Sequence, residues 1–211
     1  MEARNDEPID LVLIDAGGAN LGSVRYAFER LGIIPRIVRD ADGLAGADRI
    51  VLPGVGAAAP AMAALRSQGL DTALRETRLP LLGICMGMQL LYEGSEEGDV
   101  DCLGLIPGHV RRMQPQAGVR IPHMGWNALH PRSDSAPPDS VLLDGVQDGD
   151  QAYFVHGFAA PVDEHTLAST RHGAAFAAMV RHGRCVGMQF HPERSSALGA
   201  TLLRNFIRWA P

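Results

Sequence analysis

PLLGICMG, residues 80–87, is a short apolar run that ends in a turn flanked by glycines. The run predicts a buried strand, and helical spacing begins again over Met86 to Tyr92. Outward from this stretch, further apolar runs lie at 11–14, 33–38 and 49–52, with helical patterns between them. Strands that alternate with helices predict a parallel sheet covered on both faces.

The second half of the chain has a different pattern, in which short β-like runs replace that alternation. The runs lie at 105–113, 152–158, 166–171, 175–181 and 185–190. One helix is predicted over about 57–75, an exposed loop over 131–140, and an apolar stripe predicts a closing helix that includes Trp209.

These patterns together predict an α/β fold. Its centre is a doubly wound, mostly parallel sheet flanked by helices, with an additional small antiparallel sheet. We expect a flexible N-terminus over residues 1–8 and a single domain over residues 9–211.

The composition excludes several classes of protein. The chain has 211 residues, 46% of them hydrophobic, and its net charge of −5 argues against broad nucleic-acid binding. Three cysteines, an odd number, do not make a disulfide framework, and Cys102 and Cys185 have the apolar neighbours of packing residues. The histidines lack metal-ligand spacing, and no apolar run approaches the roughly 18–20 residues of a membrane span. We therefore expect a cytoplasmic protein with no metal, cofactor, nucleic acid or membrane as a partner.

Gly83-Ile84-Cys85-Met86-Gly87 has the form of a nucleophile elbow, with Cys85 at the junction of a strand and a helix. The two glycines permit the sharp turn, and the start of a helix favours a thiolate. The Met86 amide would then face a developing oxyanion. A small cysteine that only fills space is the alternative, and the flanking glycines favour the nucleophile.

A cysteine nucleophile needs an acid or base partner. His191 ends the last apolar run and is followed by Pro192 and Glu193. Because residues two apart in an extended segment point the same way, His191 and Glu193 are expected to face one site, with Pro192 keeping the segment extended. An ordinary turn is the alternative, and the elbow favours the dyad.

Pro53-Gly54-Val55-Gly56 follows the third predicted strand, at the sheet edge where doubly wound folds bind ligands. This loop would offer a second backbone N–H to an oxyanion, although for this loop alone an ordinary strand–helix turn is the favoured explanation. His156 lies at another predicted strand end and is expected to border the pocket.

With these residues in hand, the chain resembles the class I, triad-type glutamine amidotransferases. The resemblance extends over almost the whole domain and rests on IDAGGANLGSV (14–24), LPGVGA (52–57), LGICMGMQLLYEGSEEG (82–98), IPHMGWN (121–127), YFVHGF (153–158) and GMQFHPERSS (187–196). The chain departs from the family's usual pattern at Ala16 and Gly18 in the first loop. Gly157 and Phe158 also lack hydroxyl groups that the family usually has.

The resemblance implies a role for each matching residue. Cys85 becomes the nucleophile, His191 the acid and base, and Glu193 the partner that orients His191. Backbone amides near the oxyanion would come from Gly54, Val55 and Met86. Contacts to L-glutamine would come from Gly56, Gln89, His156, Gly157 and Phe158.

The resemblance also implies a partner chain, because 211 residues leave no room for a synthase domain beside a glutaminase. The partner would be a (β/α)8-barrel cyclase subunit that receives ammonia and makes imidazole glycerol phosphate and AICAR from PRFAR, in histidine biosynthesis. An exposed tryptophan commonly anchors an interface. The expected docking residues are therefore Asn20, Met124, Trp126 and Asn127, with burial of Trp126 in the core as the alternative.

Two other functions stay open at this point. A glutaminase subunit could serve another synthase, of the pyridoxal phosphate or anthranilate type, although IPHMGWN argues against it. The same fold could also be a non-catalytic redox or interaction module with Cys85 as a sensor thiol. Such a module has no need of His191 and Glu193.

Overall fold

Apolar runs with little polar alternation form the parallel part of the central sheet, as expected for strands buried on both faces. In the computed structural model, five strands are parallel neighbours. They are β1 (Leu11–Ile14), β2 (Arg36–Val38), β3 (Arg49–Gly54), β4 (Leu81–Cys85) and β14 (Cys185–Met188). The structure describes residues 9–17, 20–133 and 139–211, so the prediction for residues 1–8 and the departure at Gly18 lie outside the described residues.

Three further strands extend this sheet in the antiparallel sense: β13 (Ala174–His182), β12 (Thr166–His172) and β9 (His130–Pro131). The full order is β2-β1-β3-β4-β14-β13-β12-β9. A smaller sheet is formed by β11 (Phe158–Ala159), β7 (Ile106–Arg112), β5 (Tyr92–Ser95) and β6 (Val100–Asp101), and β10 (Gln151–His156) pairs with β8 (His123–Ala128). The predicted fold class is confirmed.

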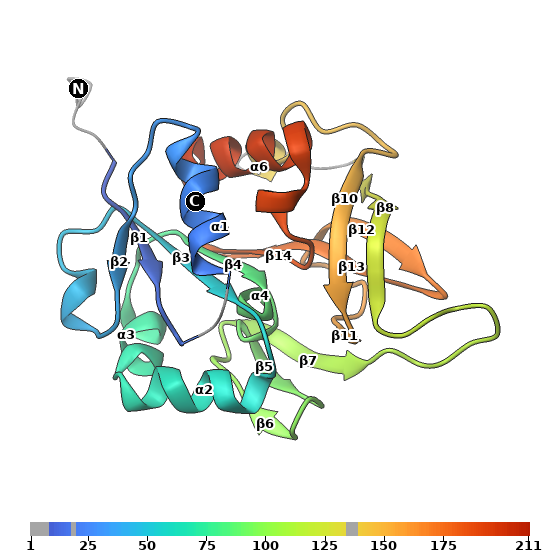
Figure 1. Cartoon of the computed structure of the whole chain (residues 1–211), viewed down its shortest axis with the longest axis horizontal. Helices are drawn as coiled ribbons and strands as arrows, with labels where there is room; N and C mark the ends of the chain where they lie inside the picture. The colour runs from blue at the N-terminus through green and yellow to red at the C-terminus, as the bar shows by residue number, and fades with distance from the viewer. Residues whose placement is uncertain (1–8, 18–19, 134–138) are drawn as a thin grey trace.

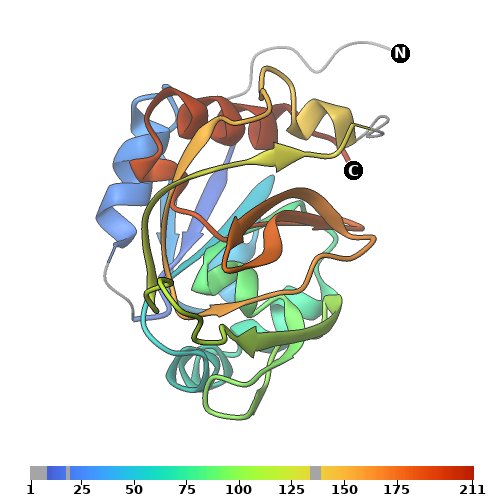
Figure 2. The same ribbon diagram turned by 90° about the vertical axis from the view of Figure 1, so that its right-hand side faces the viewer.

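Helices cover both faces of the central sheet, and the alternation of side chains along each strand explains why. Leu11 and Leu13 of β1 belong to one apolar cluster, and Val12 and Ile14 to the other. The first cluster contains α1 (Leu21–Glu29) and α6 (Ser196–Arg208), and the second contains α2 (Ala58–Ser67) and α3 (Leu70–Glu76). Figures 1 and 2 show the two helical layers on opposite sides of the sheet.

Two predicted helices differ from the observed ones. The helix predicted over 57–75 is two helices, because Gly69 adopts a left-handed conformation with φ of 67°. The helix predicted from Met86 to Tyr92 is a single turn, α4 (Met86–Gln89), and Tyr92 already belongs to β5. Leu90, Leu91 and Tyr92 are all buried, so no polar face remains for a longer surface helix.

The remaining helical segments are short. They are the 3₁₀ turns η1 (Asp42–Leu44) and η2 (Pro192–Arg194) and the single turn α5 (Asp139–Leu142), which begins inside the stretch predicted as loop. None of the helices in the described ranges is long and apolar enough to cross a membrane.

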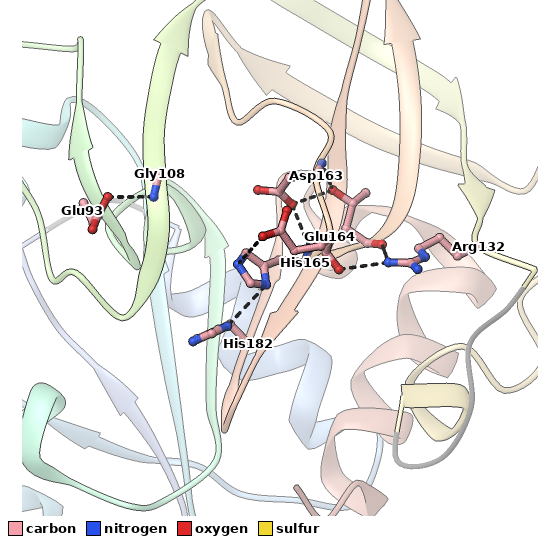
Figure 3. A network of polar contacts seen from close by, with 8 residues as sticks. Glu93, Gly108, Arg132, Asp163, Glu164, His165 and His182 are labelled. Carbon is pink, nitrogen blue, oxygen red and sulfur yellow. Dashed lines mark hydrogen bonds and ion pairs between the residues drawn. The ribbon is translucent and has the colours of Figure 1, made fainter.

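Polar contacts hold the start of the β12–β13 ribbon, as Figure 3 shows. The Asp163 carboxylate accepts hydrogen bonds from the His165 backbone N–H and the Thr166 hydroxyl, at 2.9 and 3.2 Å. Arg132 Nη1 donates to the Glu164 carbonyl oxygen at 2.9 Å. These bonds fix the turn from which the antiparallel part of the sheet begins.

Candidate active site

The turn at the end of β4 exists because two glycines let chain segments pack closely. An added Cβ at Gly83 would overlap the backbone of Gly87, and one at Gly87 would overlap the Leu52 carbonyl. Between them Cys85 has φ of 52°, an unusual conformation for a side-chain-bearing residue. Strain of this kind costs about 1–3 kcal/mol and concentrates at functional sites. The helix after Cys85 has only four residues, so its dipole at the thiol is small.

The Cys85 thiol is largely buried and touches two other segments of the fold. Its Sγ lies 3.7 Å from the Val155 carbonyl oxygen on β10 and 3.8 Å from Gln189 Nε2 beyond β14. Cys85 and the His191 side chain line the same pocket, and interaction with Cys85 raises the pKa of His191. The predicted nucleophile and its predicted acid–base partner therefore face one pocket.

His191 and Glu193 come together, but by a different local structure from the one predicted. Pro192 begins the 3₁₀ turn η2 instead of extending the chain, and the turn brings His191 Nδ1 within 2.8 Å of Glu193 Oε1. The Ser195 hydroxyl donates to the His191 carbonyl at 2.7 Å and accepts from the Tyr153 N–H at 3.0 Å. This fixes η2 against β10, with His191 Nδ1 directed to the Glu193 carboxylate.

Asn20 completes this polar cluster. Its backbone is left-handed, with φ of 84°, and its Nδ2 donates to Glu193 Oε1 at 2.6 Å. The sequence pattern placed Asn20 at a docking surface, whereas its side chain lies on the buried carboxylate. No local sequence signal predicts this contact, because the two residues are 173 positions apart.

The charges of this cluster support one another. Burial alone lowers the pKa of His191, but hydrogen bonds and charges from Cys85 and Glu193 outweigh it and raise the pKa. Burial likewise raises the pKa of Glu193, and the bonds from His191 and Asn20 reverse the direction and lower it. An imidazolium between a carboxylate and a thiol is the arrangement that activates a cysteine nucleophile.

A pocket of about 230 Å³ opens beside Cys85. This is smaller than the roughly 300–1,000 Å³ of sites for drug-sized ligands and suits a molecule of amino-acid size. The predicted residues that line it are Val55, Gly56, Met86, Gln89, His156, Gly157 and Phe158, together with Cys85 and His191. Gly54 is paired with Cys85 between strands β3 and β4, but it does not line this pocket.

Gln89 is the most deeply placed polar residue of the lining. Its Nε2 donates to the Phe158 carbonyl and to Gln189 Oε1, each at 2.9 Å. Its Oε1 is buried and has no hydrogen-bond partner among the described residues. An acceptor of this kind is available to a ligand that donates a hydrogen bond.

The sequence patterns did not single out Glu97, which also lines the pocket. Its carboxylate accepts a hydrogen bond from the Ala58 N–H at 3.1 Å, and burial raises its pKa, opposed by that bond and by Arg112. The signal lay in the GSEEG segment, 94–98, where three polar residues follow an apolar run.

The four residues predicted to dock a partner separate into two pairs. Met124 and Trp126 lie on the outer face of β8, 65% and 52% exposed, so Trp126 is not a core residue. The Trp126 ring meets Tyr153 edge-on at 5.8 Å. Asn127 and Asn20 instead direct their side chains to polar groups inside the protein.

The other two cysteines are buried thiols. Burial raises the pKa of Cys102 and of Cys185 to about 11, so both are protonated at neutral pH. Within the described residues no group of three or more His, Cys, Asp or Glu side chains could hold a metal ion.

Comparison with known proteins identifies the family. The model of the class-I glutamine amidotransferase family matches residues 12–209, and the chain belongs to this family. Among curated relatives, it is 62% identical over 198 residues to the imidazole glycerol phosphate synthase subunit HisH of Xanthomonas campestris pv. campestris, covering 94% of this chain and 96% of that protein. The protein of the same name from Xylella fastidiosa is 56% identical over the same shares of the two chains.

Solved structures agree on the fold. A putative GMP synthase subunit from Thermoplasma acidophilum matches with a TM-score of 0.72 at 20% identity, covering 96% of this chain and 94% of that one. PurLQS from Thermotoga maritima matches with a TM-score of 0.69 at 20% identity, over 96% and 99% of the two chains.

Proposed function

We propose that this chain is the glutaminase subunit of imidazole glycerol phosphate synthase and that Cys85, His191 and Glu193 are its catalytic triad. The observation that carries the chemistry is the hydrogen bond between the His191 imidazole and the buried Glu193 carboxylate, with His191 and the Cys85 thiol lining the same pocket. The assignment to histidine biosynthesis is supported by the relatives named HisH at up to 62% identity.

The reaction is hydrolysis of the side-chain amide of L-glutamine. The Cys85 thiolate attacks the carboxamide carbon, and backbone N–H groups of Val55 and Met86 stabilise the oxyanion; loss of one such donor typically costs about 3–4 kcal/mol. His191 gives its proton to the departing nitrogen, so ammonia leaves and a glutamyl thioester remains. Neutral His191 then takes a proton from water, whose hydroxide attacks the thioester and releases glutamate and the thiolate.

The pocket lining accounts for recognition of an amino acid. Glu97 supplies a carboxylate for the α-ammonium group, and the unpartnered Gln89 Oε1 accepts a hydrogen bond from the substrate. Because Gly157 and Phe158 carry no hydroxyl group, this wall of the pocket contacts glutamine through backbone atoms. Recognition of the substrate thus depends on backbone position as much as on side chains.

Ammonia released in this pocket requires a second active site nearby, since in solvent it is protonated and no longer nucleophilic. The partner we propose is a (β/α)8-barrel cyclase subunit, which combines the ammonia with PRFAR to give imidazole glycerol phosphate and AICAR in the cytoplasm. The exposed pair Met124 and Trp126 forms an apolar patch suited to that partner. Docking there would also set the orientation of the Val55 peptide and so switch the oxyanion site on.

Release of glutamate from glutamine, measured for the chain alone and with the ligand-bound cyclase subunit, tests the proposal. We expect strong stimulation by the partner and no turnover by Cys85→Ala, with Cys102→Ala as a matched cysteine control that keeps activity. Turnover by Cys85→Ala at the parent rate would contradict the catalytic assignment and favour a sensor thiol. An active enzyme that the cyclase subunit does not stimulate would instead contradict the assigned partner.

A further inference from the structure

Strand β8 carries different chemistry on its two faces. Met124 and Trp126 point outward, whereas His123 and Asn127 alternate with them and point inward. His123 is only 3% exposed and stands directly opposite His156 in the β8–β10 register. His156 in turn lines the pocket beside Cys85, so the inner face of β8 is in contact with the pocket wall.

Three hydrogen bonds run in series from Asn127 to this wall. Asn127 Nδ2 lies 3.3 Å from His123 Nε2, and His123 Nδ1 lies 3.1 Å from His156 Nε2. His156 Nδ1 then lies 2.8 Å from the Phe158 carbonyl oxygen. The Asn127 amide is oriented by its other contacts, because its Oδ1 accepts from the Ala128 N–H at 2.9 Å.

The two ends of the series fix where each hydrogen lies. The Phe158 carbonyl can only accept, so His156 carries its hydrogen on Nδ1 and its Nε2 accepts. His123 must then carry its hydrogen on Nδ1 as well, and its Nε2 accepts from Asn127. One arrangement satisfies all three bonds, and in it both imidazoles are neutral. A second proton on His123 would lie on Nε2, where its N–H would face the N–H of Asn127 Nδ2, so two donors would meet with no acceptor between them.

The surroundings keep both imidazoles neutral. Burial lowers the pKa of His156 to about 3, and the neighbouring imidazoles of His123, His172 and His191 lower it further, against the opposing bond to Phe158. Burial and the charge of His172, which stacks on His123 at 4.1 Å, lower the pKa of His123 to about 4. The direction of the hydrogen bonds is therefore stable at physiological pH.

The series ends on an atom that shapes the pocket. The Phe158 carbonyl accepts both from His156 and from Gln89 Nε2, and all three residues line the pocket. We infer that His123 is a positioning residue, oriented by Asn127, that holds the wall formed by His156 and Phe158 in the shape that binds glutamine. This inference rests on the proposed glutaminase function. In it, His123 affects the binding of glutamine and not the catalytic triad.

A pair of substitutions of equal shape separates the hydrogen bond from packing. His123→Asn keeps an N–H donor near the position of Nδ1, and His123→Leu has the same outline without the donor. Both variants lose the imidazole ring of His123 and leave a cavity of the same size, so they differ only in the hydrogen-bond donor. Loss of a buried partner leaves His156 Nε2 unsatisfied, so we expect KM for glutamine to rise about tenfold in His123→Leu relative to His123→Asn. The kcat values should stay within about twofold, because the triad is untouched.

The assay uses the full chain with the cyclase subunit, and His172→Leu serves as the neighbouring control, with KM near that of the parent. Equal KM values in His123→Asn and His123→Leu, in enzymes that turn over, would overturn the inference and leave the proposed function intact. If the parent chain, assayed with the cyclase subunit, did not hydrolyse glutamine at all, the proposed function itself would be contradicted.

A spectroscopic measurement tests the inference without any turnover. With ¹⁵N-labelled histidine, the parent should show His123 and His156 as neutral Nδ1–H tautomers at neutral pH. In His123→Leu, His156 should stay the Nδ1–H tautomer, held by the Phe158 carbonyl, but its Nε2 resonance should shift because Nε2 has lost its hydrogen-bond donor. In His123→Asn that resonance should stay near its position in the parent. Observation of a charged His123, or of the Nε2–H tautomer at either residue in the parent, would overturn the assignment.

Discussion

His191 and His156 stand on the same pocket and are equally buried, each 6% exposed, yet their pKa values move in opposite directions. The pKa of His191 is raised, because the Glu193 carboxylate and the Cys85 thiol outweigh burial. The pKa of His156 falls to about 3, because its neighbours are a backbone carbonyl and other imidazoles. Burial penalises charge at both residues, and the partner group decides the outcome. One end of the pocket thus carries a charged imidazole and the other a neutral one.

Removal of the charge beside His191 should have the largest effect. Glu193→Gln deprives the imidazolium of its carboxylate and makes the environment of His191 resemble that of His156. We expect kcat for glutamine hydrolysis to fall on the order of 10³-fold or more, as for other triads that lose their carboxylate. Steady-state kinetics of ammonia release would measure it.

Glu193→Asp is the control for this change, since it keeps the charge and should retain more activity than Glu193→Gln. A loss below tenfold in Glu193→Gln would contradict the view that the carboxylate sets the charge of His191.

Acid should destabilise the neutral end of the pocket. An unfolded histidine binds a proton near pH 6.5, whereas folded His123 and His156 resist protonation down to about pH 4 and pH 3. Between these values the unfolded chain binds more protons, so the free energy of unfolding decreases as the pH falls. The expected slope is at most about 1.4 kcal/mol per pH unit for each histidine. His191 contributes with the opposite sign: its stabilisation is complete below about pH 6.5 and is lost as the pH rises through its raised pKa.

Urea unfolding at several pH values from 6.5 down to about 4 would measure the slope. His123→Asn removes one of the two titrating groups, so its slope should be shallower than that of the parent. Equal slopes in the two proteins would show that His123 is not held neutral.

The comparison also separates what the sequence predicts from what it does not. Cys85 with its flanking glycines, and His191 with Glu193, are local patterns, because each depends on residues within a few positions. The inward role of Asn127 depends on β8, which was not among the predicted strands. Its apolar residues Met124 and Trp126 lie on the exposed side, so the usual alternation of apolar and polar residues is reversed.

The same distinction explains the errors in helix prediction. Spacing predicted one helix over 57–75, but a left-handed glycine at position 69 divides it. The apolar segment from Leu90 to Tyr92 fits a buried strand as well as a helix, and in the structure Leu90 and Leu91 form a buried turn before Tyr92 begins β5. Contacts between residues far apart in sequence, such as that of Asn20 with Glu193, leave no local pattern at all.

That contact provides the smallest and most selective test. Asn20→Ala removes the 2.6 Å donor to Glu193 Oε1 without removing any charge. The carboxylate is fully buried at its side chain, so its other hydrogen bond, from His191, must orient it alone. A lost bond to a charged group is worth about 1.5–3 kcal/mol at most, and water that enters the space recovers part of it. We therefore expect kcat to fall about tenfold with KM nearly unchanged, since Asn20 does not line the pocket.

The pattern of rates separates orientation of the triad from docking at Asn20. A defect in orientation lowers glutamine turnover by the same factor whether or not the cyclase subunit is bound. A defect in docking would disappear at saturating cyclase subunit, because mass action restores the complex. If a saturating concentration of the cyclase subunit restores the parent rate, Asn20 belongs to the docking surface and its hydrogen bond to Glu193 does not contribute to kcat. A tenfold defect that persists at saturation places it with the charged end of the pocket.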